Sequence, residues 1–298
     1  MKLVTFRDPG GQEHPGVVDG DDVVTIEGVA TTRELFAQDA TLSRAQSASG
    51  QRYALDEVRL LPPIKPAKLI HTSGNFREHE EESKVVSWSH AIAPWIVFFQ
   101  NVDAIIGQDD PIVYPEHLTR ELDHELELAV VLGKAGAFFD EEEAGGYVGG
   151  YLIFNDITAR DIQRREMKSG VFSFCKSIQT FCPLGPWIVT PDEVGDPHTL
   201  DMRLTVNGDL RQHSYSGNMS VTLPELIAHH SPLGYQQGDV LTTGTVSGVA
   251  GFKSDAEKWY LQPGDIVECT IDRVGTLRNP VVSWETAHGT PPPAFRDW

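Results

Sequence analysis

Alternating apolar and polar residues along several short segments of the chain predict strands. The clearest case is residues 121–133, where the two kinds of residue largely alternate before an apolar run begins. Because successive side chains of a strand point to opposite faces, Asp123, Glu125 and Glu127 are expected on one face. Taken alone, this segment favours an exposed strand at a sheet edge, where charge opposes aggregation. The alternative is a cation site, since buried carboxylates this close repel one another.

Other segments add strands and a few helices. Apolar runs bounded by turn residues predict strands over residues 16–24 (two strands), 68–73, 94–99, 148–154, 184–189, 200–206, 210–214, 238–243 and 264–271. Helical signals lie at 32–37, with Thr32 as the cap, at 75–84 (a polar helix or a mobile loop), at 158–167, with Thr158 as the cap, and at 223–230. The Asn207-Gly208 pair predicts the tight turn of a hairpin.

The chain divides at a proline-rich segment, residues 61–66, which interrupts both helices and strand ladders. We therefore expect a small N-terminal domain over residues 1–62 and a larger domain over 66–284. Residues 285–298 contain three consecutive prolines and are expected to form an extended, loosely held tail.

Composition narrows the classes of function. The 298 residues carry 24 Lys and Arg against 43 Asp and Glu, a net charge of -19, which disfavours nucleic acid and anionic membranes as partners. No apolar run is long enough for a signal peptide or a membrane span. Three cysteines without a CxxC pair argue against a disulfide framework, so a cytoplasmic location is expected.

A few polar residues outside the acidic strand are candidates for chemistry. His79 and Glu82 are three residues apart, so on a helix the carboxylate could orient the imidazole, although such acidic runs are also typical of solvated surfaces. Asp156 follows an apolar strand at its junction with a polar turn, a position typical of functional sites. Arg160 and Gln163 fall on one face of the helix that follows. The glycine-rich loop at 244–248 matches neither nucleotide-binding pattern, G-x-x-x-x-G-K-[ST] or G-x-G-x-x-G.

Several motifs, taken in order, resemble the fumarylacetoacetate hydrolase family across roughly residues 66–283. The matching blocks are Gly74-Asn75-Phe76-x-x-His79-x-x-Glu82, Asp123-His124-Glu125-Leu126-Glu127 with the apolar run to Gly133, Asn155-Asp156-x-x-Ala159-Arg160-Asp161-x-Gln163, Lys176-Ser177, Cys182-Pro183-Leu184-Gly185-Pro186-Trp187, Gly244-Thr245-x-Ser247-Gly248 and Pro263-Gly264-Asp265. Given this resemblance, a metal site becomes the favoured interpretation of the acidic strand, in place of an exposed sheet edge.

The resemblance implies an α+β, mainly β fold: a catalytic domain built as a mixed β-roll or β-sandwich, with a small N-terminal α+β domain, assembled as a homodimer. Glu125, Glu127 and Asp156 would hold one divalent cation. Three carboxylates suit a hard octahedral ion that keeps open positions, so Mg²⁺ is favoured, with Mn²⁺ or Ca²⁺ as alternatives.

The implied activity is hydrolysis of a carbon–carbon bond in a small 2-oxo acid, typically a 2,4-dioxo acid of the acylpyruvate or fumarylpyruvate type. His79, oriented by Glu82, would take a proton from water, and the cation would stabilise the departing pyruvate enolate. Lys176 and Gln163 would donate to the same oxygens, and Thr245 would bind the substrate carboxylate. Arg160 would either bind substrate or brace the acidic cluster.

The sequence departs from the family pattern at four positions. Where the family usually has Tyr, Tyr, Lys and Pro, this chain has Phe76, His124, Gln100 and Val246. His124 is expected to point away from the metal. The missing lysine removes one cation near the substrate, so the reaction itself stays open: an isomerase, a decarboxylase or a dehydratase of a related 2-oxo acid would use the same metal site.

Two alternatives belong to other classes. The first is a non-catalytic binding module with a structural cation. The second is a thiol enzyme that uses Cys175 or Cys182, although neither residue stands in an evident base-paired motif.

Overall fold

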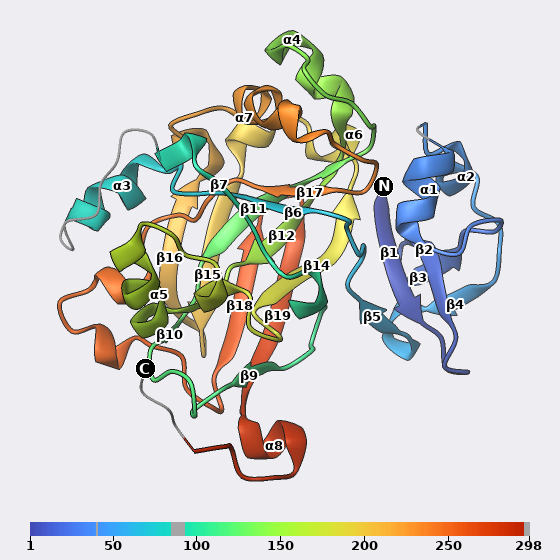
Figure 1. Cartoon of the computed structure of the whole chain (residues 1–298). Helices are drawn as coiled ribbons and strands as arrows, with labels where there is room; N and C mark the ends of the chain where they lie inside the picture. Colours follow the sequence, from blue (N-terminus) through green and yellow to red (C-terminus); the bar gives the residue numbers. More distant parts are fainter. Residues whose placement is uncertain (40, 85–92, 295–298) are drawn as a thin grey trace.

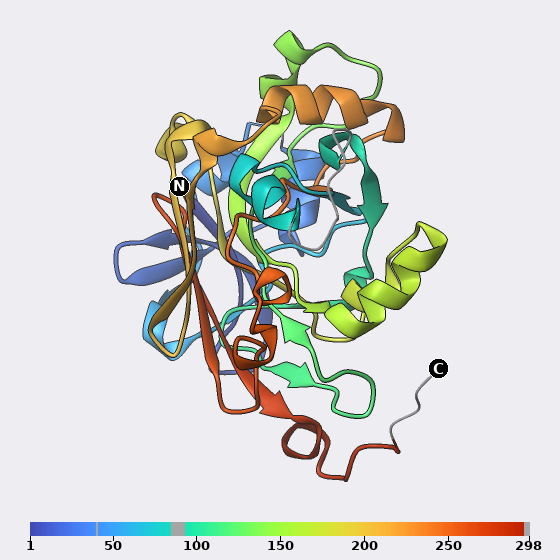
Figure 2. The same ribbon diagram turned by 90° about the vertical axis from the view of Figure 1, so that its left-hand side faces the viewer.

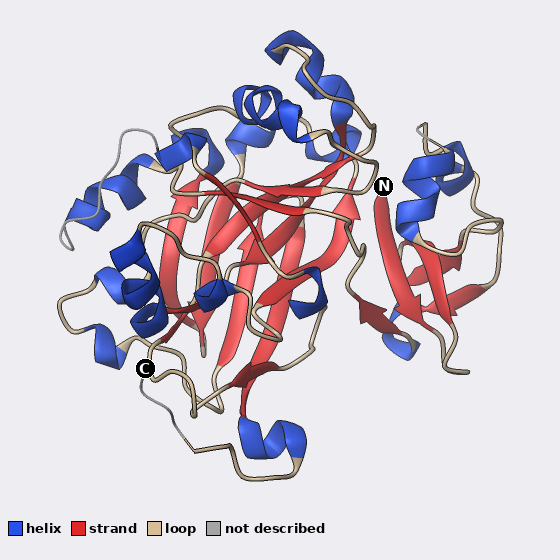
Figure 3. Cartoon of the chain, viewed as in Figure 1, coloured by secondary structure: helices blue, strands red, loops and turns tan. Residues whose placement is uncertain are grey.

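The computed structural model describes residues 1–39, 41–84 and 93–294. Over these residues it confirms the predicted fold class: strands predominate, helices lie around them, and the sheets form no closed barrel (Figure 1, Figure 3). The described strands form a twelve-stranded sheet, a five-stranded sheet and a two-stranded ribbon.

The large sheet runs in the order β4-β3-β2-β1-β14-β12-β11-β17-β6-β7, with β5 added at β1 and β8 at β14. Its strands are β1 (Lys2–Arg7), β2 (Glu13–Asp19), β3 (Asp22–Thr25), β4 (Arg52–Ala54), β5 (Arg59–Leu61), β6 (Leu69–Thr72), β7 (Val97–Phe99), β8 (Ile105–Ile106), β11 (Leu126–Leu132), β12 (Val148–Asn155), β14 (Cys182–Val189) and β17 (Val240–Thr242).

The second sheet runs in the order β16-β15-β18-β19-β9 and contains the predicted Asn207-Gly208 hairpin. Its strands are β9 (Ile112–Tyr114), β15 (Asp201–Val206), β16 (Asp209–Tyr215), β18 (Ile266–Ile271) and β19 (Gly275–Ser283), and the ribbon consists of β10 (Leu122–Asp123) and β13 (Thr158–Ala159).

The helices lie at the ends and sides of the sheets (Figure 1, Figure 2). They are α1 (Thr32–Gln38), α2 (Ser43–Gln46), α3 (Arg77–Ser83), α4 (Glu141–Ala144), α5 (Arg160–Glu166), α6 (Pro191–Val194), α7 (Leu223–His230) and α8 (Trp284–His288), with short 3₁₀ turns that include η6 (Met167–Ser169), η7 (Phe174–Lys176) and η11 (Ala250–Phe252). Among the described residues, no helix has both the length and the apolar composition needed to cross a bilayer.

The main core lies between the two sheets. Leu126, Leu128 and Val130 of β11 belong to this core, together with Leu204 and Val267 from the second sheet. β11 lies between β12 and β17, and all of its residues are buried. The interpretation of this segment as an exposed edge strand is therefore wrong, because the strand is covered on both faces.

A second core lies on the other face of β11, where the N-terminal part of the chain packs. Ala129 and Val131 share this cluster with Leu3 of β1 and with Leu35 and Phe36 of α1. β1 pairs with β14 through Lys2 and Leu3, so residues 1–61 extend the large sheet at one side of the molecule (Figure 1). By strand alternation Glu127 points to this same face, away from the core between the sheets.

The acidic segment is broken where one continuous strand was predicted. Asp123 ends β10, and β11 begins at Leu126, so Asp123 belongs to the ribbon with β13 rather than to the large sheet. The break is stabilised by the side chain of Asn155, whose Oδ1 accepts from the Glu125 amide at 3.0 Å. The prediction that Asp123 shares a strand face with Glu127 is therefore wrong.

Both predicted cap residues are off by one position. Helix α1 begins at Thr32, and its cap is Thr31, whose hydroxyl accepts from the Glu34 amide at 3.0 Å. Helix α5 begins after Ala159, while Thr158 belongs to β13. Helix α7 has the predicted bounds and a capping box at its start.

The predicted tail begins with a short helix. In α8, Ser283 caps the first turn by accepting from the Thr286 amide at 3.1 Å. The Trp284 ring meets the His117 ring edge-on, with the centroids 4.5 Å apart. Regular structure ends at His288 within the described part of the tail.

Candidate active site and metal centre

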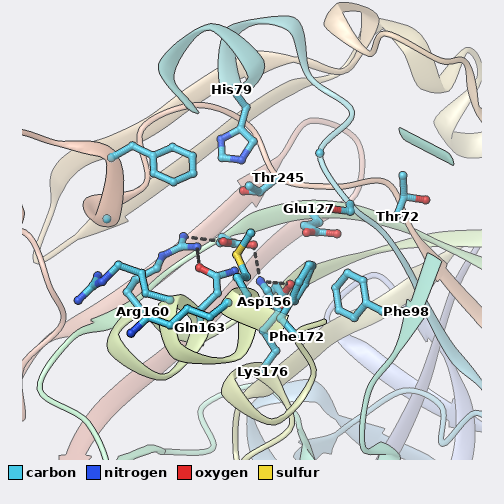
Figure 4. Close-up of a pocket in the computed structure, with 18 residues that line it drawn as sticks. Thr72, His79, Phe98, Glu127, Asp156, Arg160, Gln163, Phe172, Lys176 and Thr245 are labelled. Carbon is cyan, nitrogen blue, oxygen red and sulfur yellow. Dashed lines mark hydrogen bonds and ion pairs between the residues drawn. The ribbon is translucent and has the colours of Figure 1, made fainter. Parts of the chain in front are cut away.

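A cavity of about 490 Å³ lies among the carboxyl ends of β6 and β12, the start of β11, and helices α3 and α5 (Figure 4). Glu125, Glu127, Asp156 and Lys176 form its polar floor, and the aromatic rings of Phe98 and Phe172 form part of its wall. Those two rings pack against each other with their centroids 4.9 Å apart. A polar floor under an apolar wall suits a small ligand with one charged end.

Three buried carboxylates meet on the floor of the cavity. Glu125, Glu127 and Asp156 each offer an oxygen, and these oxygens lie within 4.8 Å of one another. Glu127 comes from β11, Glu125 from the break before it, and Asp156 from the residue after β12. The pairing of β11 with β12 brings the two segments together, and the Asp156 amide donates to the Glu125 carbonyl at 2.8 Å. This arrangement could hold a metal ion.

Lys176, on η7, lies against two of the three carboxylates. Its Nζ is 2.8 Å from Glu125 Oε2 and 2.5 Å from Asp156 Oδ2. It also donates to the Thr158 hydroxyl at 2.7 Å, so all three ammonium hydrogens have acceptors. Thr158, predicted as a helix cap, instead orients this lysine.

Arg160, the first residue of α5, links this helix to the acidic residues on either side of the break between β10 and β11. Its Nε lies 2.7 Å from Asp123 Oδ2, its Nη2 2.5 Å from Glu125 Oε1, and its Nη1 donates to Gln163 Oε1 at 2.9 Å. The Gly251 amide also donates to Asp123, and a side chain at Gly251 would collide with the Arg160 stem. Of the two roles expected for Arg160, bracing the acidic cluster is the one that these contacts provide.

The three carboxylates have different electrostatic surroundings. Burial opposes ionisation of Glu125, but the charges of Lys176 and Arg160 outweigh it and lower its pKa to about 2. Burial raises the pKa of Asp156 to about 6, even though Lys176 partly offsets it. For Glu127, burial and the neighbouring charges of Asp156 and Glu125 hold the pKa well above its usual value.

Glu127 is held by the loop that follows β17. The Gly244 amide donates to Glu127 Oε2 at 3.1 Å. Gly244 has φ of +81°, and an added Cβ would lie 3.0 Å from the Asn75 amide nitrogen. Only glycine adopts this conformation readily, so the residue type at 244 is needed to aim its N–H at the carboxylate.

His79 and Glu82 lie on α3, above the carboxylates (Figure 4). His79 Nδ1 is 3.3 Å from Glu82 Oε1, and Glu82 Oε2 accepts from the Gly248 amide at 2.8 Å. The His79 ring stacks on Phe252 with the centroids 5.1 Å apart. The imidazole therefore has a carboxylate on Nδ1, is packed on one face, and points into the cavity.

Thr245 lines the cavity, but its hydroxyl already has protein partners. It donates to the Leu126 carbonyl at 3.1 Å and accepts from Gln212 Nε2 at 3.1 Å. Gln212, on β16 of the second sheet, also accepts from the Leu126 amide at 2.9 Å. Sequence reasoning missed Gln212, because its contacts arise only when the two sheets pack.

The four departures from the family pattern occupy distinct places. His124 is buried and lies 3.3 Å from Gln212 Oε1, away from the three carboxylates as expected. Phe76 and Val246 are core residues. Gln100 is buried beside the three carboxylates, where its Nε2 donates to Asp156 Oδ1 at 2.5 Å.

The structure does not support a thiol nucleophile. Cys175 and Cys182 are buried, and neither is among the described residues that line the cavity. Burial raises the pKa of both thiols well above the usual value, which suppresses the thiolate.

The residues present fit a divalent cation. Asp123, Glu125, Glu127 and Asp156 are four buried acids in one cluster with two buried cations, Arg160 and Lys176, which pair with all of them except Glu127. When all are ionised, two negative charges remain, which one divalent ion would balance. The oxygen-only ligand set suits Mg²⁺, Mn²⁺ or Ca²⁺.

Comparison with known proteins covers most of the chain. Residues 68–282 match the family model described as fumarylacetoacetate (FAA) hydrolase C-terminal, and residues 1–63 match the model described as Rv2993c-like, N-terminal. The oxaloacetate tautomerase YisK of Bacillus subtilis (strain 168) is 40% identical, with 77% of this chain and 75% of that protein covered. The 2,4-didehydro-3-deoxy-L-rhamnonate hydrolase of Sphingomonas sp. (strain SKA58) is 34% identical, with 95% and 97% covered.

Solved structures show the same fold. A fumarylacetoacetate hydrolase from the psychrophile Exiguobacterium antarcticum superposes with a TM-score of 0.81 at 30% identity, covering 95% of this chain and 99% of its own. Maleylpyruvate hydrolase from Sphingobium sp. SYK-6, solved with manganese(II) ion and pyruvate, gives a TM-score of 0.74 at 29% identity and the same coverage.

Proposed function

Because the chain belongs to the fumarylacetoacetate hydrolase family, we propose that it is a divalent-metal-dependent hydrolase that cleaves a carbon–carbon bond in a 2,4-dioxo acid of the acylpyruvate or fumarylpyruvate type. One observation carries the proposal. The His79–Glu82 pair faces the same cavity as Glu125, Glu127 and Asp156. A base that activates water thus lies across one cavity from a site that binds the 2-oxo acid end of the substrate.

His79 is the general base in this proposal. Glu82 holds Nδ1, so Nε2 is the nitrogen that accepts a proton from water. The water oxygen adds to the C4 carbonyl, and the C3–C4 bond then breaks. Its electron pair goes to C3, which becomes the enolate carbon of a pyruvate fragment and is later protonated to a methyl group. The other fragment leaves as a carboxylic acid, so one water is consumed for each pyruvate released.

Lys176 and Gln163 would assist the departure of the pyruvate fragment. The Lys176 ammonium lies on the cavity floor, and burial there strengthens its attraction for developing negative charge. The Gln163 side chain lines the same cavity and is oriented by Arg160. When bound, the cation would supply the positive charge that makes a pyruvate enolate an acceptable leaving group.

We take Mg²⁺ as the preferred ion and Mn²⁺ as its functional substitute. The all-oxygen ligand set favours hard cations, and the manganese(II) ion in maleylpyruvate hydrolase supports a substitute of this kind. The substrate, the homodimeric state and the cytoplasmic location stay predictions.

A second candidate is an enol–keto tautomerase of an oxaloacetate-like acid, and the relationship to YisK favours it. Tautomerisation moves a proton from the enol oxygen to carbon without adding water. The cavity offers His79 as the group that could donate or accept that proton, and the Lys176 ammonium as a fixed positive charge beside the enolate oxygen. The two reactions therefore differ in whether pyruvate is released.

A substrate panel separates the two functions. Metal-stripped protein would be supplied with Mg²⁺ and assayed with acetylpyruvate, fumarylpyruvate, enol-oxaloacetate and a 2-oxo-3-deoxy sugar acid. We expect loss of the dioxo absorbance with equimolar pyruvate. Rapid ketonisation of oxaloacetate without pyruvate from any dioxo acid would replace the hydrolase with the tautomerase. No turnover of any compound, with ligand binding unaffected by His79→Ala, would favour a non-catalytic binding module.

A further inference from the structure

Gln100 is a buried amide whose side chain is held at both ends. It follows β7, is 6% exposed, and its backbone amide donates to the Leu69 carbonyl at 3.2 Å. Its Nε2 donates to Asp156 Oδ1 at 2.5 Å, and its Oε1 accepts from the Cys182 thiol at 3.3 Å. These contacts fix the orientation of the amide, with its donor end toward the carboxylate.

The two oxygens of Asp156 therefore have partners of different charge. Oδ2 lies 2.5 Å from the Lys176 ammonium, whereas Oδ1 receives the neutral amide of Gln100. A second ammonium in the place of Gln100 would cancel one of the two negative charges left in the acidic cluster. An apolar side chain would leave Oδ1 without this donor and free the carboxylate to rotate about its Cβ–Cγ bond.

We propose that Gln100 is a positioning residue of the candidate metal centre: it fixes the Asp156 carboxylate with a neutral hydrogen bond, and so leaves the site more negative, and its affinity for a divalent cation higher, than the lysine usual in the family would. The inference rests on the proposed metal site and not on the choice between hydrolysis and tautomerisation. Residues that orient metal ligands through hydrogen bonds commonly change metal affinity by about 10–100-fold when they are replaced.

Three substitutions at one position test the proposal by charge. Gln100→Met keeps the length of the side chain and removes the hydrogen bond, Gln100→Lys adds a positive charge, and Gln100→Glu adds a negative one. Gln108→Met is the matched control, because Gln108 accepts from the Arg278 amide at a distance from the site. The measurement is the Mn²⁺ dissociation constant of the whole metal-stripped protein by isothermal titration calorimetry, with circular dichroism to verify folding.

We expect Gln100→Met to weaken Mn²⁺ binding about tenfold, Gln100→Lys to weaken it further, and Gln100→Glu to bind more tightly than Gln100→Lys. Gln108→Met should bind Mn²⁺ as the wild-type protein does. A purely structural role would not order the variants by charge. If Gln100→Met and Gln100→Lys fold and bind Mn²⁺ with wild-type affinity, the role of Gln100 is wrong, while the metal site itself is unaffected. Failure of the wild-type protein to bind Mn²⁺ would overturn the metal centre as well.

Discussion

The Lys176 ammonium lies 2.8 Å from Glu125 Oε2, although 51 positions separate the two residues in the chain. Glu127, two residues after Glu125, has a different environment, because its carboxylate accepts a hydrogen bond from the Gly244 amide. Among the ion pairs of the described residues, none includes Glu127. Glu127 is thus a buried acid that has no ion-pair partner among the described residues, as expected of a metal ligand.

Glu127→Gln keeps the shape of this side chain and removes its charge. We expect Mn²⁺ affinity to fall at least tenfold and activity to fall with it, because one of three anionic ligands is lost. The metal-free variant should be as stable as the wild-type protein or more stable, since ionising a buried, unbalanced carboxylate costs free energy. Calorimetry and urea unfolding would check both effects. Unchanged Mn²⁺ affinity would contradict the assignment.

His79→Asn removes the proposed base without touching the carboxylates. We expect the turnover number to fall by about 10²–10⁴, the usual contribution of a positioned general base. Glu82→Gln should have a smaller effect in the same direction, because it only orients the imidazole. Mn²⁺ affinity, measured by calorimetry, should stay at the wild-type value in both. If metal binding fell together with activity, His79 would belong to the metal centre instead.

Arg160 and Arg164, one helical turn apart on α5, allow a matched comparison. Arg160 is buried between Asp123 and Glu125, whereas Arg164 pairs with Glu121 and is 59% exposed. Arg160→Met should lower the free energy of unfolding by about 3–5 kcal/mol, because it leaves buried carboxylates without their partner. Arg164→Met should cost less than about 1 kcal/mol. Urea denaturation of the metal-free proteins tests the contrast, and equal losses would refute it.

Protons should compete with the cation at this site. The pKa of Asp156 is raised to about 6, above its usual value, so the folded metal-free protein binds a proton that the unfolded chain releases near pH 4. The contribution of Asp156 to the free energy of unfolding of the metal-free protein is therefore greatest at low pH, and it is lost as pH rises from about 4 to 6. Added Mg²⁺ should remove the loss.

The check is the urea midpoint across this pH range with and without Mg²⁺. Mn²⁺ affinity should also fall as pH drops below about 6, because protons then occupy the carboxylates. An Asp156→Asn variant is the control and should lack this part of the pH dependence. A wild-type Mn²⁺ affinity that is flat between pH 5 and 7 would argue against carboxylate ligands.

Local patterns determined much of the fold and the chemical identity of the site. Apolar periodicity located β11, β12, β18 and α7, and the Asn207-Gly208 turn located the β15–β16 hairpin. These signals depend on side chains that are close in sequence, so they can be recognised without knowledge of the fold. The ordered motifs added the family, and with it the expectation that Glu125, Glu127 and Asp156 meet.

Tertiary structure decided what surrounds those residues. The break at His124 and Glu125, which moves Asp123 out of the large sheet, depends on the Asn155 side chain 30 positions away. Gln212 and Gln100 reach the site only because the sheets pack and β7 lies beside β6. Burial and charge pairing depend on distances between remote segments, and sequence spacing carries no such distances. The residue types for a metal site could therefore be predicted from the sequence. Which basic side chain pairs with each acid could not be predicted.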